Sequence, residues 1–431
     1  MADLERRSDT PALRTGRRGA STSASPSSRR PEVVARQQSL RQHNLGVALR
    51  HVLDAPAPVS RADIAGATGL TRATVSALVD RLLALDLVME LEPVAAQRAG
   101  RPAVPLVPSR GTVAAVGMEL NVDYLGVRAV DLAGHVVAEE VRADDFRGSD
   151  PQEVLGRLAG LAGQVVARLS ADGVALVGSA LALPGLVDSV TGPLRRAPNL
   201  GWRDVDVVAL LTRDPVLAGL PPRLANEANL AAGAEARVRR LTGPSSFVYV
   251  SGEVGVGGAI VLDGQIFPGR HGWSGEIGHM ALGTTGRSDE GGTLESYAGQ
   301  DAILARAGLD RTEPLAHLIA AADAGDARAL EALDVAGSAL GVALANVVNV
   351  VDVEQVVLGG IYAELAGHLG GAVSEQLRRR VLSAEWSSVE VSVAQAGPYP
   401  AMTGGALSVL QALVDDPAGW AGDETAALAD T

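Results

Sequence analysis

The chain contains no cysteine among its 431 residues. This absence excludes disulfide bonds, thiolate zinc sites and cysteine nucleophiles, and it is compatible with a cytosolic protein. Lysine is absent as well, so every basic side chain is an arginine, the residue better suited to bidentate contacts with phosphate and guanine. Aromatic residues make up 3% of the chain and hydrophobic residues 47%, so a large core is expected.

Long uninterrupted hydrophobic runs are missing too. The longest, such as residues 338–351, are interrupted by Asn346 and Asn349 and fall short of a membrane-spanning helix. The N-terminus is basic but lacks the apolar core of a signal peptide. We therefore expect no membrane segment and a cytoplasmic location.

The net charge of −13 is distributed unevenly along the chain. Residues 1–110 hold 16 arginines and 10 acidic residues, a net of +6, whereas the remainder holds 21 arginines and 40 acidic residues, a net of −19. A basic head on an acidic body indicates that the head meets nucleic acid. The alternative is an arginine-rich tail that only increases solubility.

The basic part divides into a tail and a small domain. Residues 1–32 are rich in Arg, Ser, Thr and Pro and have almost no apolar periodicity, which predicts a disordered basic tail. Residues 33–110 form the next domain, and their apolar spacing predicts a first helix over about 37–54. Two prolines, Pro56 and Pro58, end it.

Two shorter helices follow. Ser60 is a candidate N-cap for a helix through Ala67, with Asp63 three residues later as an imperfect capping box. Gly69 makes a turn, and Thr71 caps the third helix. The side chains of the third helix that face inward are predicted to be Val75, Leu78, Val79 and Leu82.

Helix, short glycine-containing turn and helix is the helix-turn-helix pattern. Residues 87–91 and 104–107 read as two strands joined by a basic tip, which adds a wing. The predicted module is therefore a winged helix-turn-helix, although a three-helix module that contacts another protein stays an alternative. The side chains expected to contact DNA, in the major groove or through the wing, are Thr71, Arg72, Thr74, Ser76, Arg98 and Arg101.

From Thr112 onward the pattern changes to α/β. Three successive strands, a helix over about 151–170 and a further strand ending at Leu183 make a first half, and a second half repeats the theme with strands near 247–262, three helices and a strand to Leu358. Two strand-rich halves backed by helices predict two lobes with a cleft between them.

A glycine-rich segment over residues 272–280 places Glu276 and His279 three residues apart. A carboxylate that only accepts hydrogen bonds, next to an imidazole that donates or accepts, suits a polar ligand. The same pair also reads as half of a metal site, but no cysteine follows to complete it. We expect Trp273 to pack rather than to stack on a ligand.

Several segments together resemble the ROK family of repressors, open reading frames and kinases, over roughly residues 40–412. Each segment is short, but seven occur in the family's order behind a winged helix-turn-helix. They are Pro184-Gly185-Leu186-Val187-Asp188, Arg196-Ala197-Pro198-Asn199-Leu200-Gly201-Trp202, Asn226-Glu227-Ala228-Asn229, Gly255-Val256-Gly257-Gly258, Gly275-Glu276-Ile277-Gly278-His279-Met280, Leu294-Glu295-Ser296-Tyr297-Ala298 and Val357-Leu358-Gly359-Gly360.

The resemblance implies an α/β fold in which the winged helix-turn-helix precedes a two-lobed sugar-kinase/actin-like (ribonuclease H-like) domain. That domain would cover residues 111–414, with the lobes split near residue 232 and a flexible acidic tail over 415–431. A sugar would bind between the lobes. The resemblance places the sugar contacts on Asn199, Asn226, Glu227, Glu276, His279 and Glu295.

Phosphoryl transfer requires a phosphate cradle, a positioned metal and a base. Kinases of the family carry an Asp-x-Gly-Gly-Thr loop in the first hairpin, where this chain has Glu119-Leu120-Asn121-Val122-Asp123. Both glycines are gone, and Asp123 adds negative charge where phosphate would sit. Glu227 also replaces the kinases' base, an Asp, and a displacement of about 1 Å can be costly in catalysis.

Many members of the family follow the His with three cysteines that help bind a structural zinc. Those positions fall here on Gly286, Ser288 and Thr293, none of which ligates zinc usefully. Asp289 and Glu290 offer oxygen, but one His with scattered carboxylates is poor support for a closed tetrahedral site. We predict no metal and no cofactor.

These observations predict a sugar-responsive transcriptional regulator of carbohydrate metabolism, a repressor without enzymatic activity. Its partners would be operator DNA, a sugar or sugar phosphate effector, and further copies of the chain in a homodimer or homotetramer. The alternatives are an active sugar kinase and a DNA-binding regulator that has lost its sugar. Which sugar acts, and whether it releases or promotes DNA binding, is left open by the residues.

Overall fold

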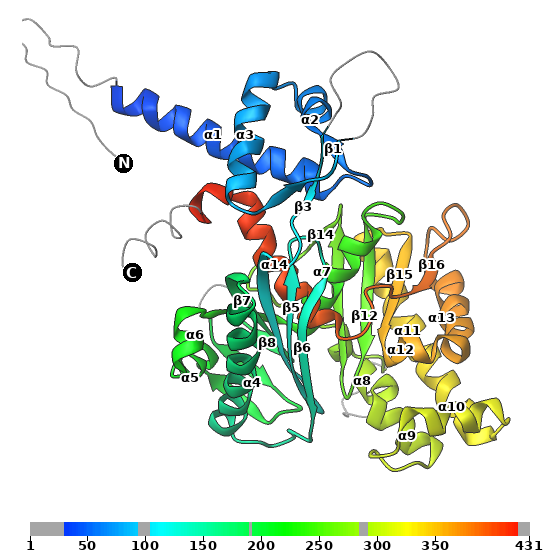
Figure 1. Ribbon diagram of the computed structural model, residues 1–431. Coiled ribbons are helices and arrows are strands. Elements are labelled where there is room, and N and C mark those ends of the chain that lie inside the picture. Colours follow the sequence, from blue (N-terminus) through cyan, green and yellow to red (C-terminus); the bar gives the residue numbers. More distant parts are fainter. Residues whose placement is uncertain (1–29, 94–103, 189–191, 284–291, 421–431) are drawn as a thin grey trace, which may run out of the picture.

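Two five-stranded sheets form the body of the molecule (Figure 1). The computed structural model describes residues 30–93, 104–188, 192–283 and 292–420. The first lobe has strand order β11-β7-β4-β5-β6, and the second has β14-β13-β12-β15-β16. The strands are β4 (Val113–Leu120), β5 (Tyr124–Asp131), β6 (Val136–Ala143), β7 (Ala175–Leu183), β11 (Pro222–Asn226), β12 (Phe247–Gly252), β13 (Val256–Leu262), β14 (Gln265–Ile266), β15 (Gln355–Gly360) and β16 (Glu390–Val393).

Both sheets follow the same plan. Three consecutive strands pair antiparallel. A fourth strand pairs parallel with the first of them, and a fifth pairs parallel with the fourth. Parallel neighbours need a crossover connection, and helices supply it in each lobe. This repeated plan confirms the predicted α/β fold with two lobes.

The central strand of the first lobe, β4, is buried along its whole length. Its sequence is therefore almost continuously apolar instead of alternating, as expected for a strand covered on both faces. The helix α4 (Pro151–Ala171), which Asp150 caps, packs its apolar stripe into the core on one face, and α14 (Pro400–Asp415) covers the other.

Helices of the second lobe bury a separate core. Its longest helix, α11 (Ala327–Val351), has the length and apolar character of a membrane span, but half of its most apolar window is buried inside the protein. The first of the three expected helices is divided at Gly299 into two short ones. The other helices are α8 (Leu294–Ala298), α9 (Gln300–Ala307), α10 (Leu315–Asp323), α12 (Ile361–Glu364) and α13 (Ala366–Arg380).

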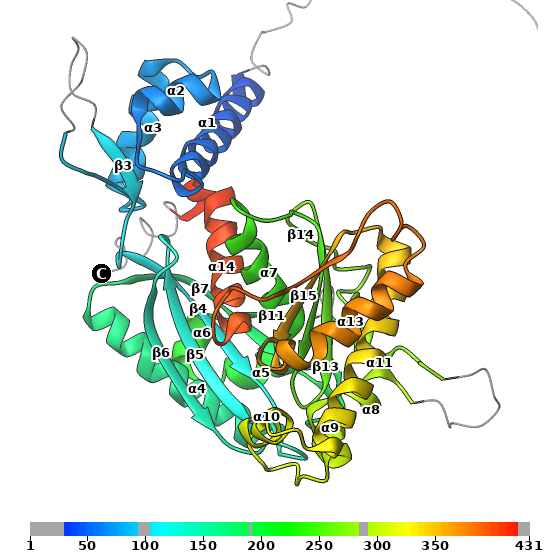
Figure 2. The same ribbon diagram turned by 90° about the vertical axis from the view of Figure 1, so that its right-hand side faces the viewer.

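Two helices lie at the junction of the lobes, α7 (Glu227–Arg239) and α14 (Figure 2). A Cβ atom on Gly404 of α14 would overlap the carbonyl oxygen of Leu230 in α7, so the helices cross at backbone distance. The lobe boundary expected near residue 232 falls inside α7. Because α14 follows the second lobe in sequence yet packs on the sheet of the first, the lobes are not consecutive halves.

Five further elements extend the first lobe near the cleft. A small sheet has strand order β10-β9-β8, and two short helices follow it. They are β8 (Leu186–Val187), β9 (Leu194–Ala197), β10 (Trp202–Val205), α5 (Val207–Leu211) and α6 (Pro215–Gly219).

The head has the three helices and the strand pair predicted for a winged helix-turn-helix. Ser60 and Asp63 form both reciprocal bonds of a full capping box, and Gly69 ends the second helix at φ 71°. The first helix begins at Arg30, within the stretch expected to be disordered. The elements are α1 (Arg30–Leu53), β1 (Val59–Ser60), α2 (Arg61–Thr68), α3 (Arg72–Ala84), β2 (Val88–Glu90) and β3 (Pro105–Pro108).

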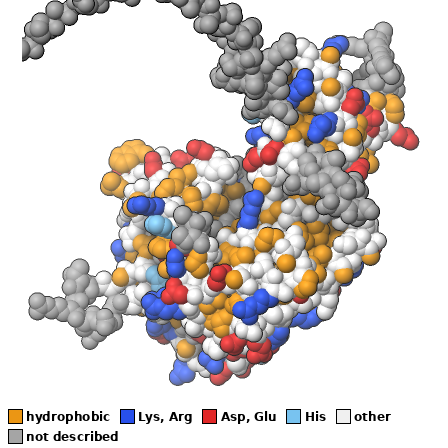
Figure 3. All heavy atoms as spheres, turned by 90° about the vertical axis from the view of Figure 1, so that its left-hand side faces the viewer, with side chains coloured by type: hydrophobic (Ala, Val, Ile, Leu, Met, Phe, Trp, Pro, Cys, Tyr) orange, Lys and Arg blue, Asp and Glu red, His pale blue; other side chains and the backbone are white. Residues whose placement is uncertain are grey.

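The head (residues 30–108) shares one hydrophobic core with the first lobe and α14. Leu45 and Leu49 of α1 belong to the same buried cluster as Leu410 and Leu413 of α14. Trp420, in the expected flexible tail, packs against this cluster as well. Figure 3 shows the head standing on the body, with arginine and acidic side chains mixed on this face. The apolar contact makes the orientation of the head depend on α14.

We predict that Gly404→Ala destabilises the protein by about 1–3 kcal/mol, because the added methyl forces α14 away from α7. Urea unfolding followed by circular dichroism measures the effect. In the control Gly156→Ala, the added methyl meets nothing within 4 Å, so the better helix propensity of Ala should stabilise by up to about 1 kcal/mol. Equal stability of the wild type and Gly404→Ala would contradict the close crossing.

Candidate functional site: a carboxylate-lined cleft

Side chains from both lobes meet over Gly255. Glu295, on α8, accepts a hydrogen bond from the backbone N–H of Val256 at 2.9 Å. A Cβ atom on Gly255 would lie 2.6 Å from Oε2 of Glu295 and 2.8 Å from Nδ2 of Asn199, which lies in the first lobe. The glycine is therefore needed so that these two predicted site residues approach each other across the cleft.

Glu276 and His279 are held by a loop that lies directly on β13. Gly275 has φ 94°, and a Cβ on it or on Gly278 would overlap backbone atoms of β13. The glycines let this segment press against the strand, and a short 3-10 helix (Ile277–His279) follows Glu276. Glu276 is half-buried, whereas His279 is exposed.

Trp273 joins this loop to the opposite lobe. Its indole N–H donates to the carbonyl oxygen of Val187 at 3.0 Å, and its ring stacks on His271 with centroids 4.8 Å apart. The side chain is 37% exposed and adds a polar contact between the lobes; that it packs rather than stacks on a ligand stays a prediction.

The junction of β11 and α7 carries Asn226 and Glu227. Asn226 caps the helix, because its Oδ1 accepts from the N–H groups of Ala228 and Asn229 at 2.9 and 3.2 Å. Its Nδ2 donates to the carbonyl oxygen of Gly185 at 3.1 Å. These bonds give Asn226 a structural role and leave it one amide hydrogen for a ligand.

Glu227 lies in the first turn of α7, and its carboxyl interacts with several other carboxyl groups. Burial, together with the charges of Glu119, Glu276, Asp123 and Glu295, raises its pKa to about 8. Its Oε2 is buried and has no hydrogen-bond partner in the part of the chain that the structure describes.

Glu119 lies at the end of β4 with only 3% of its surface exposed. Burial raises its pKa to about 7, although hydrogen bonds from Tyr124 and Asn121 oppose the shift. Burial also raises the pKa of Glu253, which follows β12, well above its usual range. The pKa of Asp123 is raised by burial as well. The cleft thus concentrates carboxyl groups that resist ionisation.

A small cavity of about 20 Å³ lies among these groups, between the lobes. Sequence reasoning singled out the Glu119 segment but missed Glu253, for which the adjoining glycine loop Gly255–Gly258 was the available signal. Kinases of the family carry their phosphate-binding loop at the position of Glu119–Asp123, and in this chain the same position contributes the buried carboxyl of Glu119. The cavity is lined by Glu119, Asn121, Tyr124, Glu227, Ala228, Ala231, Ser251, Glu253, Gly257, Pro400 and Ala401.

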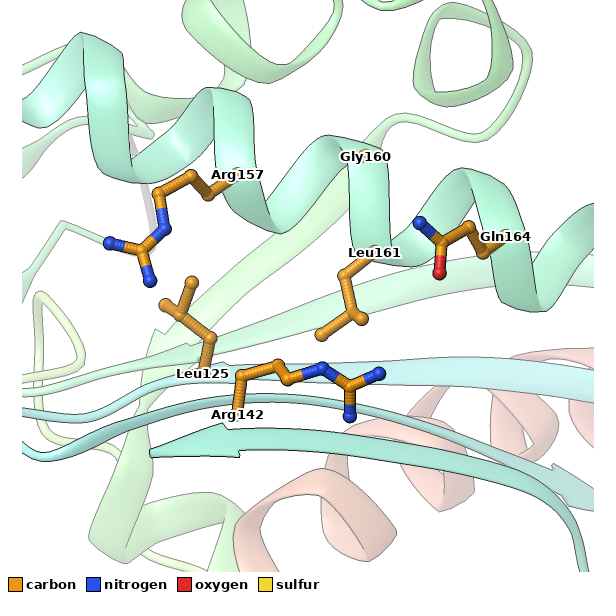
Figure 4. A pocket seen from close by; sticks show the side chains of 6 residues that line it. All are labelled: Leu125, Arg142, Arg157, Gly160, Leu161 and Gln164. Atoms are coloured by element: carbon orange, nitrogen blue, oxygen red, sulfur yellow. The ribbon is translucent and has the colours of Figure 1, made fainter. Parts of the chain in front are cut away.

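A larger hollow of about 240 Å³ lies elsewhere, between α4 and the strands β5 and β6 (Figure 4). Arg142 and Arg157 flank it, but each already has an acidic partner: Arg142 lies 3.0 Å from Glu140, and Arg157 lies 2.8 Å from Asp144. None of the predicted site residues lines this hollow.

The cysteine-equivalent positions Gly286 and Ser288 lie outside the described residues, and Thr293 begins α8 without a side-chain capping bond. Among the residues that are described, no group of three or more His, Asp or Glu side chains is placed to hold a metal ion. The absence of a structural zinc stays a prediction.

The predicted DNA contacts gather at the start of α3. Thr71 caps the helix through the N–H of Thr74 at 3.2 Å, and Arg72 beside it is exposed. Ser76 lies one turn further along and is half-buried. Arg98 and Arg101 fall in the wing tip, outside the described residues.

The carboxyl cluster predicts an unusual pH dependence. Because the folded pKa values of Glu119 and Glu227 are raised from 4.5 to about 7 and about 8, the folded protein binds protons that the unfolded chain releases. The free energy of unfolding should therefore fall as pH rises from about 5 to about 8.

Glu227→Gln should flatten this decline by on the order of 2 kcal/mol, as measured by urea unfolding at several pH values. Other groups facing the cluster, namely Asp123, Tyr124, Glu253, Glu276, His279, Glu295, Arg128 and Arg147, remain in that variant. A steeper decline in Glu227→Gln would contradict the assignment.

The chain is similar to a protein family model, to curated proteins and to solved structures. A family model described as "ROK family" matches residues 115–412. The xylose repressor of Bacillus subtilis is 26% identical over 363 residues, which cover 83% of this chain and 92% of the repressor. A crystal structure of a ROK family transcriptional regulator, described as a homologue of the Escherichia coli Mlc protein, superposes with a TM-score of 0.71 at 27% identity.

That regulator structure covers 88% of this chain and 97% of its own. The ROK hexokinase from Thermus thermophilus, also 27% identical, has a TM-score of 0.57 and covers 99% of its own chain but 70% of this one. The regulator therefore matches more of this chain than the kinase does. The chain belongs to the ROK family.

Proposed function

We propose that this protein is a sugar-responsive DNA-binding transcriptional regulator, a repressor of carbohydrate metabolism genes that acts in the cytoplasm. The observation that carries the proposal is a winged helix-turn-helix head whose core is continuous with α14, a helix that also lines the cleft cavity through Pro400 and Ala401. The relatives named as repressors support the same function.

The sugar would lie between the lobes, in contact with Asn199, Glu227, Glu276, His279 and Glu295, and with the remaining amide hydrogen of Asn226. Carboxylates accept hydrogen bonds from sugar hydroxyls, and the amides both donate and accept. A sugar that leaves one of these groups unpaired is rejected, which gives the site its selectivity.

The charge of the cleft disfavours a sugar phosphate. Glu119, Glu227 and Glu253 line the cavity, which has no arginine among its lining residues. Arg147, whose charge acts on Asp123, is already paired with Asp145 and Asp301 at 3.2 and 3.4 Å. A phosphate would find no cation to pair with in this lining, and its charge would oppose every carboxyl there that ionises, so an effector without a phosphate group fits better.

The acidic lining of the cavity, which contains no arginine, also opposes phosphoryl transfer. ATP phosphates need closely spaced backbone N–H groups and cations, whereas Asn121 is buried at 2% exposure and its side chain caps the N–H of Val122 at 2.6 Å. Glu253 lines the same cavity, which has no arginine in its lining, and the charge of Asp123 acts on Glu119. Release of ADP from ATP with any hexose would contradict this part of the proposal.

On DNA, α3 would enter the major groove from its N-terminal end, and two heads in a homodimer or homotetramer would read two half-sites. Arg72 is free for this, because it has neither an ion pair nor a hydrogen bond among the described residues. Base-edge contacts give about 1–3 kcal/mol of discrimination per good bidentate pair.

We predict that Arg72→Ala weakens operator binding by at least tenfold, measured by fluorescence anisotropy on the promoter region of the neighbouring genes, and leaves sugar binding by calorimetry unchanged. Arg81→Ala is the matched control, because it removes the same charge from the far end of α3. Equal losses from both substitutions would indicate non-specific electrostatics, and no loss from Arg72→Ala would overturn the assigned DNA face.

A further inference from the structure

The cleft cavity contains hydrogen-bond acceptors that nothing satisfies. Oε2 of Glu119 and Oε2 of Glu227 are both buried without a partner among the described residues. Glu119 is 97% buried, since 3% of its surface is exposed, and both side chains line the same cavity. A buried acceptor without a donor is costly, which indicates that a donor is bound here when the protein functions.

The size and charge of the cavity restrict that donor. Its volume of about 20 Å³ accommodates one water-sized group. Glu253 lines the same wall, and the charge of Asp123 acts on both Glu119 and Glu227. A positively charged donor of this size is therefore preferred over a neutral one, and an ammonium group has both properties.

Other cations of the protein do not fill this role. The guanidinium of Arg128, whose charge acts on Glu119, already donates hydrogen bonds to Glu139, to the carbonyl oxygen of Pro398 at 2.8 Å and to the hydroxyl of Thr403 at 2.6 Å. Arg147 is held by Asp145 and Asp301. Among the described residues, the lining of the cavity thus contains no counter-ion.

We propose that the cavity is a subsite for an ammonium group, and that the effector is an amino sugar whose ring lies among Glu276, His279 and Glu295. The inference rests on the proposed function and specifies the chemical class of its ligand. Glu227 connects the two parts, because its carboxyl interacts electrically with Glu119 in the cavity and with Glu276 and Glu295 beside the ring.

Calorimetry on the full chain tests the proposal with glucosamine, 6-amino-6-deoxyglucose, glucose and N-acetylglucosamine. At least one amino sugar should bind tenfold or more tightly than its neutral counterparts. Its binding should release protons at pH 7, seen as a dependence of the heat on the buffer, because the raised pKa values of Glu119 and Glu227, about 7 and about 8, keep protons on these carboxyls that an ammonium group displaces.

Glu119→Gln should lower the affinity for that amino sugar at least tenfold and change the affinity for glucose less than threefold. Glu375→Gln, the same change on the surface of α13, should change neither. Neutral sugars that bind as tightly as amino sugars, or an amino preference that survives Glu119→Gln, would overturn the amine subsite alone. If no sugar binds and operator affinity never responds, the proposed function fails with it.

A second chain of contacts links the cleft to the head. The helix α7 begins at Glu227 in the cleft and ends at Arg239, which makes it about 20 Å long. Just past its end, Arg240 makes a two-pronged ion pair with Asp54, and Arg237 lies 3.0 Å from the same carboxylate. Asp54 directly follows α1 of the head.

The two ends of this connection are anchored to different lobes. Within α7, Arg239 is buried and donates to Gln355, Ser392 and the carbonyl oxygen of Val393 at 3.0–3.2 Å, all in the second lobe. The head instead packs its apolar side chains on α14, which lies on the sheet of the first lobe. A change in the angle between the lobes therefore moves Arg237 and Arg240 relative to the head.

We infer that the contact of Asp54 with Arg237 and Arg240 passes the closure of the cleft to the DNA-binding head. Asp54 is 23% exposed and the arginines 39% and 48%, so water screens the contact. Half-exposed ion pairs contribute little to overall stability, which suits a contact that ligand binding has to change.

Operator affinity with and without a bound sugar tests this role, using the same four sugars and fluorescence anisotropy. Asp54→Asn should reduce the ratio of the two affinities at least threefold while leaving sugar affinity by calorimetry within twofold. Asp80→Asn is the matched control, because it breaks a 2.6 Å pair with Arg61 inside the head. Asp54→Arg combined with Arg237→Asp and Arg240→Asp should restore part of the ratio.

A ratio that stays at the wild-type value in Asp54→Asn would overturn the coupling role. An equal reduction in Asp80→Asn would overturn it too, because the effect would then come from the head itself. A wild-type protein whose operator affinity does not respond to any sugar would instead remove the proposed function on which this inference rests.

Discussion

The crossing of α14 over α7 is the contact on which the rest of the molecule depends. Gly404 lets the backbones of the two helices meet at Leu230, and this brings the first-lobe sheet, the second-lobe sheet and the head to one place. The cleft cavity is closed by residues of the same two helices, Ala228 and Ala401 among them. A wider crossing would open the cavity and tilt the head at once, so the glycine serves both sites.

Burial of carboxyl groups is the second constraint. Glu119, Glu227 and Glu253 stand close together in a poorly solvated place, where charge is costly. In the proposed function these groups disfavour a bound phosphate more than the loss of glycines does, because a missing glycine only removes hydrogen bonds whereas the acidic lining offers no cation to pair with it. The same groups make the cleft suited to ligands rich in donors.

Much of the site was predictable because short local patterns carry it. Glu276 and His279 stand in a glycine-rich loop whose close approach to β13 follows from the absence of Cβ atoms, and Glu295 opens a helix just beyond it. Glu253 escaped prediction, since a single Glu beside a glycine loop looks like a solvated turn. The capping role of Asn226 was also missed, because an Asn directly before the first residue of a helix fits a cap and a ligand contact equally well.

Local spacing was sufficient to predict the head and the two α/β lobes, because helix caps, apolar periodicity and glycine turns act over a few residues. The family was recognised from the resemblance of seven short segments. The tertiary structure alone decided that α14 returns to the first lobe, that the head shares its core, and that Asp54 meets Arg237 and Arg240 from 183 and 186 residues away. Contacts between distant segments depend on how whole elements pack, and no short pattern records that packing.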